Sequence, residues 1–300
     1  MSFITSAGLV SYINSLNLSG PNNVIPVAAF TAIGAATSID AALVPKGNGA
    51  LMATVPDNGV TGGNKRGNNA VDWQVQRNVN NQVASGAYSV IGGGQINLSS
   101  GQWSVVAGGQ NNSASSDNAT VGGGAANGAN AVGATIPGGF AATARGVKGA
   151  YAYGGNASNN LANQGFSQIR DIVYRSSTAD ATATPLTVDN AGIVAVNNVA
   201  VMSAKQSASF LGQVIAVNTT TDEIHAWQVS GLIKRPSNAA SVVLVNSTVT
   251  DLGSDAGAAA WTVALAADVT VGGLRVTITG AAATPINWVG SIRFTEVQKP

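Results

Sequence analysis

Residues 87–146 divide into four consecutive blocks of fifteen: AYSVIGGGQINLSSG (87–101), QWSVVAGGQNNSASS (102–116), DNATVGGGAANGANA (117–131) and VGATIPGGFAATARG (132–146). The blocks stay in register without a gap, and each carries two neighbouring β-branched residues with a glycine pair shortly after them. The first β-branched column is Val90, Val105, Thr120 and Thr135, and the second is Ile91, Val106, Val121 and Ile136. A fifth block, 147–161, drifts by one position at its glycine pair. A repeat this regular indicates the architecture more directly than any single motif, because its period is characteristic of the repeating structural unit.

A unit of fifteen residues is too short for a helical repeat, which needs about 33 residues or more. The β-branched residues favour a short strand, and the glycines favour a tight turn after it. A polar run then returns the chain, with an asparagine column at Asn97, Asn112 and Asn127. The pattern predicts one coil of a β-solenoid per block, with two short strands per coil and a spacing of about 4.8 Å between coils.

The two β-branched columns also indicate how the protein assembles. Neighbouring residues on a strand point to opposite faces, so an apolar residue in both columns leaves both faces averse to water. One face fills the interior of the coil, and the other needs a partner. We therefore expect a parallel homotrimer in which these eight residues form the coil core and the trimer interface: Val90, Ile91, Val105, Val106, Thr120, Val121, Thr135 and Ile136.

The stretch SVVAGGQNNSAS (Ser104–Ser115) resembles the repeat of the left-handed β-roll in trimeric autotransporter adhesin heads, and also segments of phage tail fibres and tailspikes. The segment Gly47–Gln74 looks like the lead-in to this roll in phage fibre proteins, and the C-terminal part looks like the β-sandwich that often follows it. The resemblance covers about residues 45–298. It implies an all-β chain with a trimeric left-handed parallel β-roll, followed by an antiparallel β-sandwich or jelly-roll-like domain.

Three regions follow from this interpretation. Residues 46–165 form the lead-in and the β-roll shaft, and residues 166–300 form the β-sandwich. Residues 1–45 are either a packed cap over the first coil or a segment that attaches to the virion. The attachment residues would be apolar ones at irregular helix-like spacing: Phe3, Ile4, Leu9, Val10, Ile13 and Leu16.

The sequence pattern of residues 166–300 differs from that of the repeat. Eight or nine short apolar runs, among them Ile193–Val196, alternate with turn signals and predict antiparallel strands. Three tryptophans, Trp227, Trp261 and Trp288, are expected to anchor the core, because they supply large apolar area among small residues.

The composition excludes several function classes. Of 300 residues only 9% are charged, and 14 Lys and Arg against 13 Asp and Glu leave a formal net charge of +1. Nucleic-acid binding needs clustered cations, so we expect no nucleic-acid partner. Cysteine is absent and His225 is the single histidine, so neither a metal site nor a cofactor is expected. No apolar run reaches the roughly 20 residues that a membrane span needs, and the start shows no secretory signal.

Catalysis is also expected to be absent. Glycan cleavage uses two carboxyl groups about 5–10 Å apart, whereas Asp117 is the only carboxylate between Trp73 and Arg170. The pairs Asp222-Glu223 and Asp251/Asp255 are interpreted as turn formers, and His225 as a structural imidazole.

The sequence therefore predicts a virion structural protein, a homotrimeric tail fibre or tailspike that contacts a host surface glycan through its distal β-sandwich. Its partners would be its own copies, other virion proteins and the glycan. Four loops of the sandwich could bind the glycan, and the sequence does not choose among them. Tyr88 and Trp103, which share one column of the roll, are either glycan platforms or part of the trimer interface. The alternative function is a trimeric capsid decoration protein.

Overall fold

A computed structural model describes residues 43, 45–155 and 164–299 of the chain. All elements given below belong to one compact unit, Pro45–Pro300.

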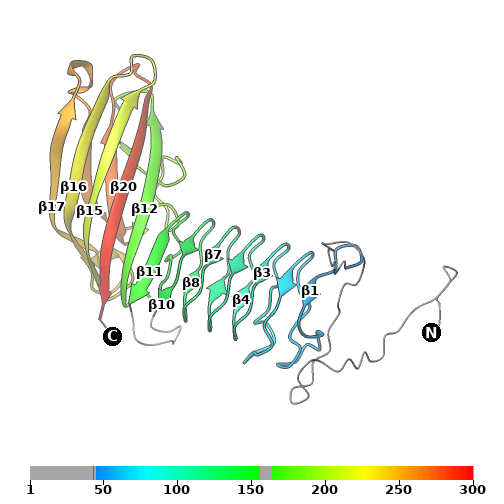
Figure 1. Ribbon diagram of the computed structural model, residues 1–300. Coiled ribbons are helices and arrows are strands. Elements are labelled where there is room, and N and C mark those ends of the chain that lie inside the picture. Colours follow the sequence, from blue (N-terminus) through cyan, green and yellow to red (C-terminus); the bar gives the residue numbers. More distant parts are fainter. Residues whose placement is uncertain (1–42, 44, 156–163, 300) are drawn as a thin grey trace, which may run out of the picture. The chain divides into compact units, whose positions relative to one another are not determined.

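The first part of this unit is a parallel β-solenoid of about six turns in an all-β chain, as the repeat predicts (Figure 1). Consecutive strands of the first ladder pair in register, so that Val90 lies opposite Val105 and Val105 opposite Thr120. The first ladder is formed by β1 (Leu51–Met52), β2 (Val71–Asp72), β3 (Val90–Ile91), β5 (Val105–Val106), β7 (Thr120–Val121) and β9 (Thr135–Ile136), and the second by β4 (Leu98–Ser99), β6 (Ser113–Ala114) and β8 (Gly128–Ala129).

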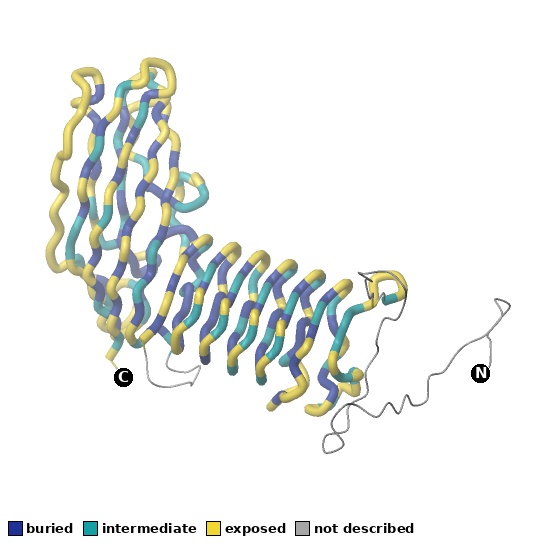
Figure 2. The backbone as a smooth tube through the Cα atoms, viewed as in Figure 1, coloured by how far each residue is buried: buried dark blue, intermediate teal, exposed yellow. Residues whose placement is uncertain are grey.

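The second β-branched column fills the interior of the coils. Ile91, Val106, Val121 and Ile136 are fully buried. The first column, on the opposite face of the same strands, is only half-buried. Figure 2 shows buried, intermediate and exposed stretches alternating along the coils of the solenoid. Each strand of this ladder therefore contributes one side chain to the interior of the solenoid, and its other side chain stays in contact with solvent.

The asparagine column forms a hydrogen-bonded ladder inside the solenoid. The side-chain amide of Asn112 donates to the carbonyls of Gly108 in its own coil, at 2.9 Å, and Gly124 in the next, at 3.0 Å. Its Oδ1 accepts from the backbone N–H of Asn127 at 3.0 Å. Asn97 and Asn127 repeat this pattern, and all three are buried. Each asparagine thus pairs with backbone groups of two coils and adds side-chain hydrogen bonds between successive coils at a buried position.

The glycine pairs have unequal roles. Gly109, the second of its pair, has φ +84°, and a Cβ there would lie 2.2 Å from the carbonyl oxygen of Gly124 in the next coil. A Cβ on Gly108 would meet nothing within 4 Å. The tight turn and the close approach of successive coils therefore require glycine at the second position. The first position is open to other residues at Gly108, but Gly93 and Gly123, the first glycines of their pairs, have φ +155°, which disfavours a side chain there.

A one-residue insertion ends the regular solenoid. Thr135 pairs with Tyr151, sixteen residues away, although Gly128 still pairs with Thr143 at a distance of fifteen. The extra residue lies at Arg145-Gly146, where both residues have positive φ. The last solenoid strands are β10 (Gly139–Phe140) and β11 (Tyr151–Gly155).

The second part of the unit holds two antiparallel sheets. Its long sheet is joined to the solenoid because β12 pairs with β11. The strands of the long sheet, in spatial order, are β12 (Ser167–Thr178), β20 (Ile286–Gln298), β15 (Gln206–Asn218), β16 (Ile224–Arg235) and β17 (Val243–Ser254). The small sheet is formed by β13 (Thr184–Pro185), β14 (Ala200–Val201), β18 (Thr262–Asp268) and β19 (Gly273–Thr279), and two 3-10 turns, η2 (Ala239–Ser241) and η3 (Ala256–Ala258), lie on either side of β17 in the sequence.

The three tryptophans lie in the core, as expected. Trp288 stacks on Trp227 with 5.6 Å between ring centroids and lies 6.1 Å from Trp261, and all three are buried. The strand predicted over Ile193–Val196 is wrong: this segment is a turn. The side chain of Asn198 accepts from the N–H of Ala195 and donates to the carbonyl of Ile193, and these local bonds replace a strand ladder.

A buried ionic network joins the solenoid to the long sheet. The carboxylate of Glu296 on β20 lies 3.0 Å from the guanidinium of Arg145, at the solenoid insertion, and 2.7 Å from that of Arg170. Gln168 donates to the same carboxylate at 2.7 Å. Burial would raise the pKa of Glu296, but the two guanidinium groups and their hydrogen bonds lower it below its ordinary value. The carboxylate is therefore held in its charged form.

Candidate functional site

The most distinctive surface of the solenoid is an aromatic pair at one corner of the coils. Tyr88 and Trp103 stand in adjacent coils with 6.3 Å between ring centroids and 14° between ring planes. Each is half exposed, at 50% and 51%. Both residues have positive φ, and the backbone N–H of Trp103 donates to the carbonyl of Ala87 in the preceding coil. Hydrogen bonds between the coils hold the backbone of this corner in the same conformation in each coil. The side chains of Tyr88 and Trp103 therefore point the same way, and their rings stack.

Polar side chains continue this corner on both sides of the rings. Asn69 in the preceding coil and Asn118 in the following coil share the positive φ of the aromatic residues. The carboxylate of Asp117 accepts from the backbone N–H of Gln102 at 2.8 Å and is exposed. We call the set Asn69, Tyr88, Trp103, Asp117 and Asn118 the corner stripe.

The corner stripe has the chemistry of a shallow saccharide site. The apolar faces of a sugar ring pack on aromatic faces, and its hydroxyl groups exchange hydrogen bonds with amides and carboxylates. The stripe offers both kinds of group on a backbone whose positions are fixed by hydrogen bonds between coils. The sequence repeat places Asn118 in the column of Tyr88 and Trp103. Asn69 precedes the first block, and only its positive φ and the bonds between coils place it at the same corner.

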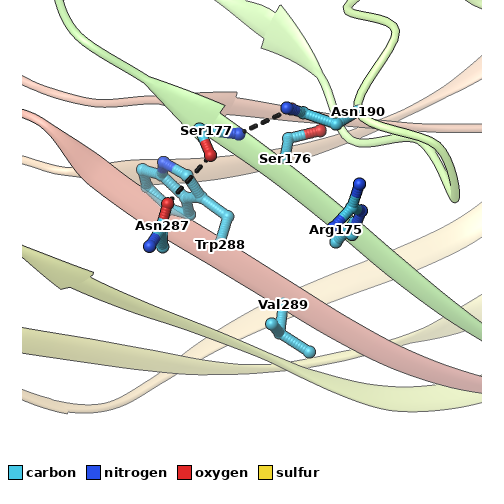
Figure 3. A pocket seen from close by; sticks show the side chains of 7 residues that line it. All are labelled: Arg175, Ser176, Ser177, Asn190, Asn287, Trp288 and Val289. Carbon is cyan, nitrogen blue, oxygen red and sulfur yellow. Dashed lines mark hydrogen bonds between the residues drawn. The ribbon is translucent and has the colours of Figure 1, made fainter. Parts of the chain in front are cut away.

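A second surface lies on the outer face of the long sheet, where β12 meets β20 (Figure 3). Its hollow of about 240 Å³ is bounded by Arg175, Ser177, Asn287, Val289 and Asn190. The backbone N–H of Ser177 donates to Asn190 and its hydroxyl donates to Asn287, both at 2.8 Å, as the dashed lines in Figure 3 show. The hollow offers hydrogen-bonding groups and one cation but no exposed aromatic ring.

The exposed aromatic residues of the described chain all lie between residues 73 and 153. They are Trp73, Tyr88, Trp103, Phe140, Tyr151 and Tyr153. In the two-sheet part the tryptophans are buried, so the loops considered for glycan binding from the sequence carry no exposed aromatic platform among the described residues.

The structure places the other candidate residues as follows. Val90, Val105, Thr120 and Thr135 form the outward, half-buried column, while Ile91, Val106, Val121 and Ile136 form the coil core. The attachment residues Phe3, Ile4, Leu9, Val10, Ile13 and Leu16 lie outside the described residues.

The single histidine is held in the core of the two-sheet part. One ring nitrogen of His225 lies 3.0 Å from the carbonyl of Ala258 and the other 3.2 Å from the carboxylate of Asp251. Its ring stacks on Trp227 with 3.8 Å between centroids. Within the described residues no three His, Cys, Asp or Glu side chains gather closely enough to hold a metal ion. None of the helices in that part of the chain has the length and apolar character of a membrane span.

Comparison with solved structures finds phage tailspike proteins. The tailspike protein gp49 of the Acinetobacter baumannii bacteriophage Fri1, described as a capsular polysaccharide depolymerase, matches with 8% identity and a TM-score of 0.27 over 83% of this chain and 45% of its own. The tailspike protein of the Acinetobacter baumannii phage AM24 matches with 10% identity and a TM-score of 0.26 over 84% and 46%. The chain thus spans less than half the length of the tailspikes it matches. No family model matches the sequence. A search of curated proteins also finds no match.

The comparison corrects one expectation. The exclusion of an enzyme is contradicted by gp49, because that protein is described as a depolymerase. The argument from carboxylates assumed a pair within one roll, and a count along one segment does not cover carboxylates brought together from elsewhere. The exclusion is withdrawn. At these identities and TM-scores neither match assigns an activity to this chain.

Proposed function

We propose that the protein is a homotrimeric fibre or spike of a phage tail that binds a host surface glycan, with the corner stripe as the glycan-binding surface. The observation that carries the proposal is the exposed, stacked pair of Tyr88 and Trp103 beside Asp117 and Asn118. A rigid corner that presents two ring faces and polar groups suits an extended saccharide chain. Residues 1–45 would attach the fibre to the virion.

This proposal moves the glycan contact from the distal sheets to the solenoid. The reason is the distribution of aromatic rings: they are exposed on the solenoid and buried in the two-sheet part. Three copies would present three stripes, so that weak contacts with a polymeric glycan add up.

Two apolar surfaces support self-association. The outward column of the solenoid carries Val90 and Val105, which are half-buried. In the two-sheet part, β17 pairs with β16 along one edge, and its residues are exposed on both faces of the strand. Val243, Val245 and Leu252 are among its exposed side chains. A long apolar edge strand left open invites pairing with other chains, so a partner that covers it stabilises the soluble protein.

The test measures binding of the full chain to purified polysaccharide from host cells. We expect Trp103→Ala to weaken binding about tenfold or more, which corresponds to about 1.4 kcal/mol. Trp73→Ala is the matched control, because Trp73 is exposed to a similar degree, at 44%, but follows β2 outside the corner stripe. Equal affinity of the two variants would place the glycan elsewhere.

Two further measurements test the remaining parts of the proposal. The mass of the protein in solution tests the trimer, and a stable monomer would contradict it. Labelling of virus particles tests the location: label on the capsid shell instead of the tail would favour the decoration protein. Binding is scored separately from release of oligosaccharides, so the proposal holds whether or not the bound glycan is cleaved.

A further inference from the structure

Four cationic side chains meet at one end of the long sheet. Lys205 precedes β15, Lys234 and Arg235 end β16, and Lys299 follows β20. The three strands are neighbours, and Gln206 at the start of β15 pairs with Arg235 on one side and with Gln298 on the other. These residues line a hollow of about 450 Å³, which we call the cationic hollow. Its size falls within the range of small-molecule sites.

Three cations of this lining carry the argument: Lys234, Arg235 and Lys299. No Asp or Glu of the described residues lines the hollow with them. Glu296 lies nearby on β20, but its carboxylate is already bound by Arg145 and Arg170. In a chain with a net charge of +1, these three cations in one lining depart locally from the balance of charge elsewhere.

Two buried donors in the lining have no acceptor. The side-chain nitrogen of Gln206 and the Nε of Arg235 are both buried and both lack a hydrogen-bond partner. Gln206 is 1% exposed, and its Oε1 accepts from the backbone N–H of Ser203. That bond fixes the orientation of the amide, so the unpaired end is the donor end. Because Gln206 and Arg235 are directly paired across the two strands, their unpaired N–H groups add to the same positive potential.

We infer that the cationic hollow binds an anionic group of a saccharide, a carboxylate or a phosphate ester. Lysine ammonium groups at the rim attract the oxyanion, and the arginine and glutamine side chains supply further N–H dipoles. This inference rests on the proposed function, since the host glycan is the source of the anion. It assigns the glycan an acidic sugar, which the corner stripe alone does not require.

The experiment titrates the full chain by calorimetry with three probes: a trimer of galacturonate, the same trimer with its carboxylates methyl-esterified, and inorganic phosphate. The variant is Lys234→Gln combined with Lys299→Gln. The control is Lys46→Gln combined with Lys65→Gln, which removes the same charge from exposed lysines outside the hollow. We expect galacturonate to bind about tenfold more weakly to the variant than to the control, and to lose affinity as salt is raised.

Three results would overturn the inference. Equal affinity of variant and control would remove the cationic hollow from recognition. Equal binding of the free and the esterified trimer would show that the carboxylate is not read. Inorganic phosphate that binds as tightly as galacturonate would show a site for free oxyanions and not for a saccharide. None of these outcomes concerns Trp103, so loss of host glycan binding in Trp103→Ala would still support the proposed function. Conversely, Trp103→Ala without effect would refute the corner stripe and leave the cationic hollow standing.

Discussion

The asparagine ladder makes a quantitative prediction for Asn112→Ala. The substitution removes two hydrogen bonds donated by the side-chain amide and one accepted from the backbone of Asn127. At about 1 kcal/mol for each of the two donated bonds the loss is about 2 kcal/mol. The N–H of Asn127 is left buried without its acceptor, which costs about 1–3 kcal/mol. Together these terms destabilise the local coil by about 3–5 kcal/mol.

The assay for this prediction is amide hydrogen exchange read by mass spectrometry on peptides that cover residues 113–131. A local reading is needed because a chain with a solenoid and a two-sheet part need not unfold in one step. A loss of about 4 kcal/mol accelerates exchange about a thousandfold, since each 1.4 kcal/mol is a factor of ten. Ser115→Ala, an exposed side chain in the same coil, is the control and should change stability by less than about 0.5 kcal/mol.

A second variant separates the two roles of the side chain. Asn112→Asp keeps the acceptor for Asn127 but sets a carboxylate oxygen against the carbonyls of Gly108 and Gly124. It should therefore disturb the coil at neutral pH, and less so in acid, where the protonated carboxyl donates to one carbonyl. Exchange in Asn112→Ala within threefold of that in Ser115→Ala would refute the reasoning, because it would mean that the ladder bonds contribute almost nothing.

Three further predictions concern the ionic network, the turns and the two β-branched columns. Glu296→Gln should lower the free energy of unfolding by about 3 kcal/mol or more, because it leaves buried guanidinium groups without a counter-charge. Since the folded-state pKa of Glu296 lies below its ordinary value of 4.5, its contribution is full above that pH and is lost as the pH falls through the lower value, so denaturation curves of the variant should depend less on pH in that window. Gly109→Ala should destabilise the solenoid by several kcal/mol, on the order of other clashes with fixed backbone, whereas Gly108→Ala should melt like the unchanged protein. Val106→Asp should abolish folding of the coil in circular dichroism, whereas Val105→Asp should leave the coil folded and prevent self-association in sedimentation; a folded, assembled Val105→Asp would contradict the role given to the outward column.

The repeat predicts the solenoid from the sequence because its cause is local. Ile91 and Val106 recur at the spacing at which they lie side by side, so composition, periodicity and packing agree. The asparagine column is visible for the same reason. Gln74, which takes the same role in the coil before Asn97, is not visible in the repeat, since it lies 23 residues away and reaches the ladder through a longer side chain.

The residues of the candidate sites are harder to predict from the sequence. Tyr88 and Trp103 share a column, but only the three-dimensional structure shows that half of each side chain is exposed to solvent. Lys205, Lys234 and Lys299 are widely separated in the chain, and only the pairing of three long strands brings them together. The sequence alone does not show which residues of these strands pair with one another.

The ladder also bears on changes in the length of the solenoid. Every internal coil bonds to the next coil in the same way: the side chain of Asn97 accepts from the N–H of Asn112, and the side chain of Asn112 accepts from the N–H of Asn127. A duplication or deletion of one whole block in the middle of the solenoid keeps the asparagine bonds at every junction, although the outward side chains of the neighbouring coils change. The terminal pieces lack this freedom, since Gln74 opens the ladder and Ala142 closes it. Recombination within the repeat would therefore lengthen or shorten the solenoid in fixed increments of one coil.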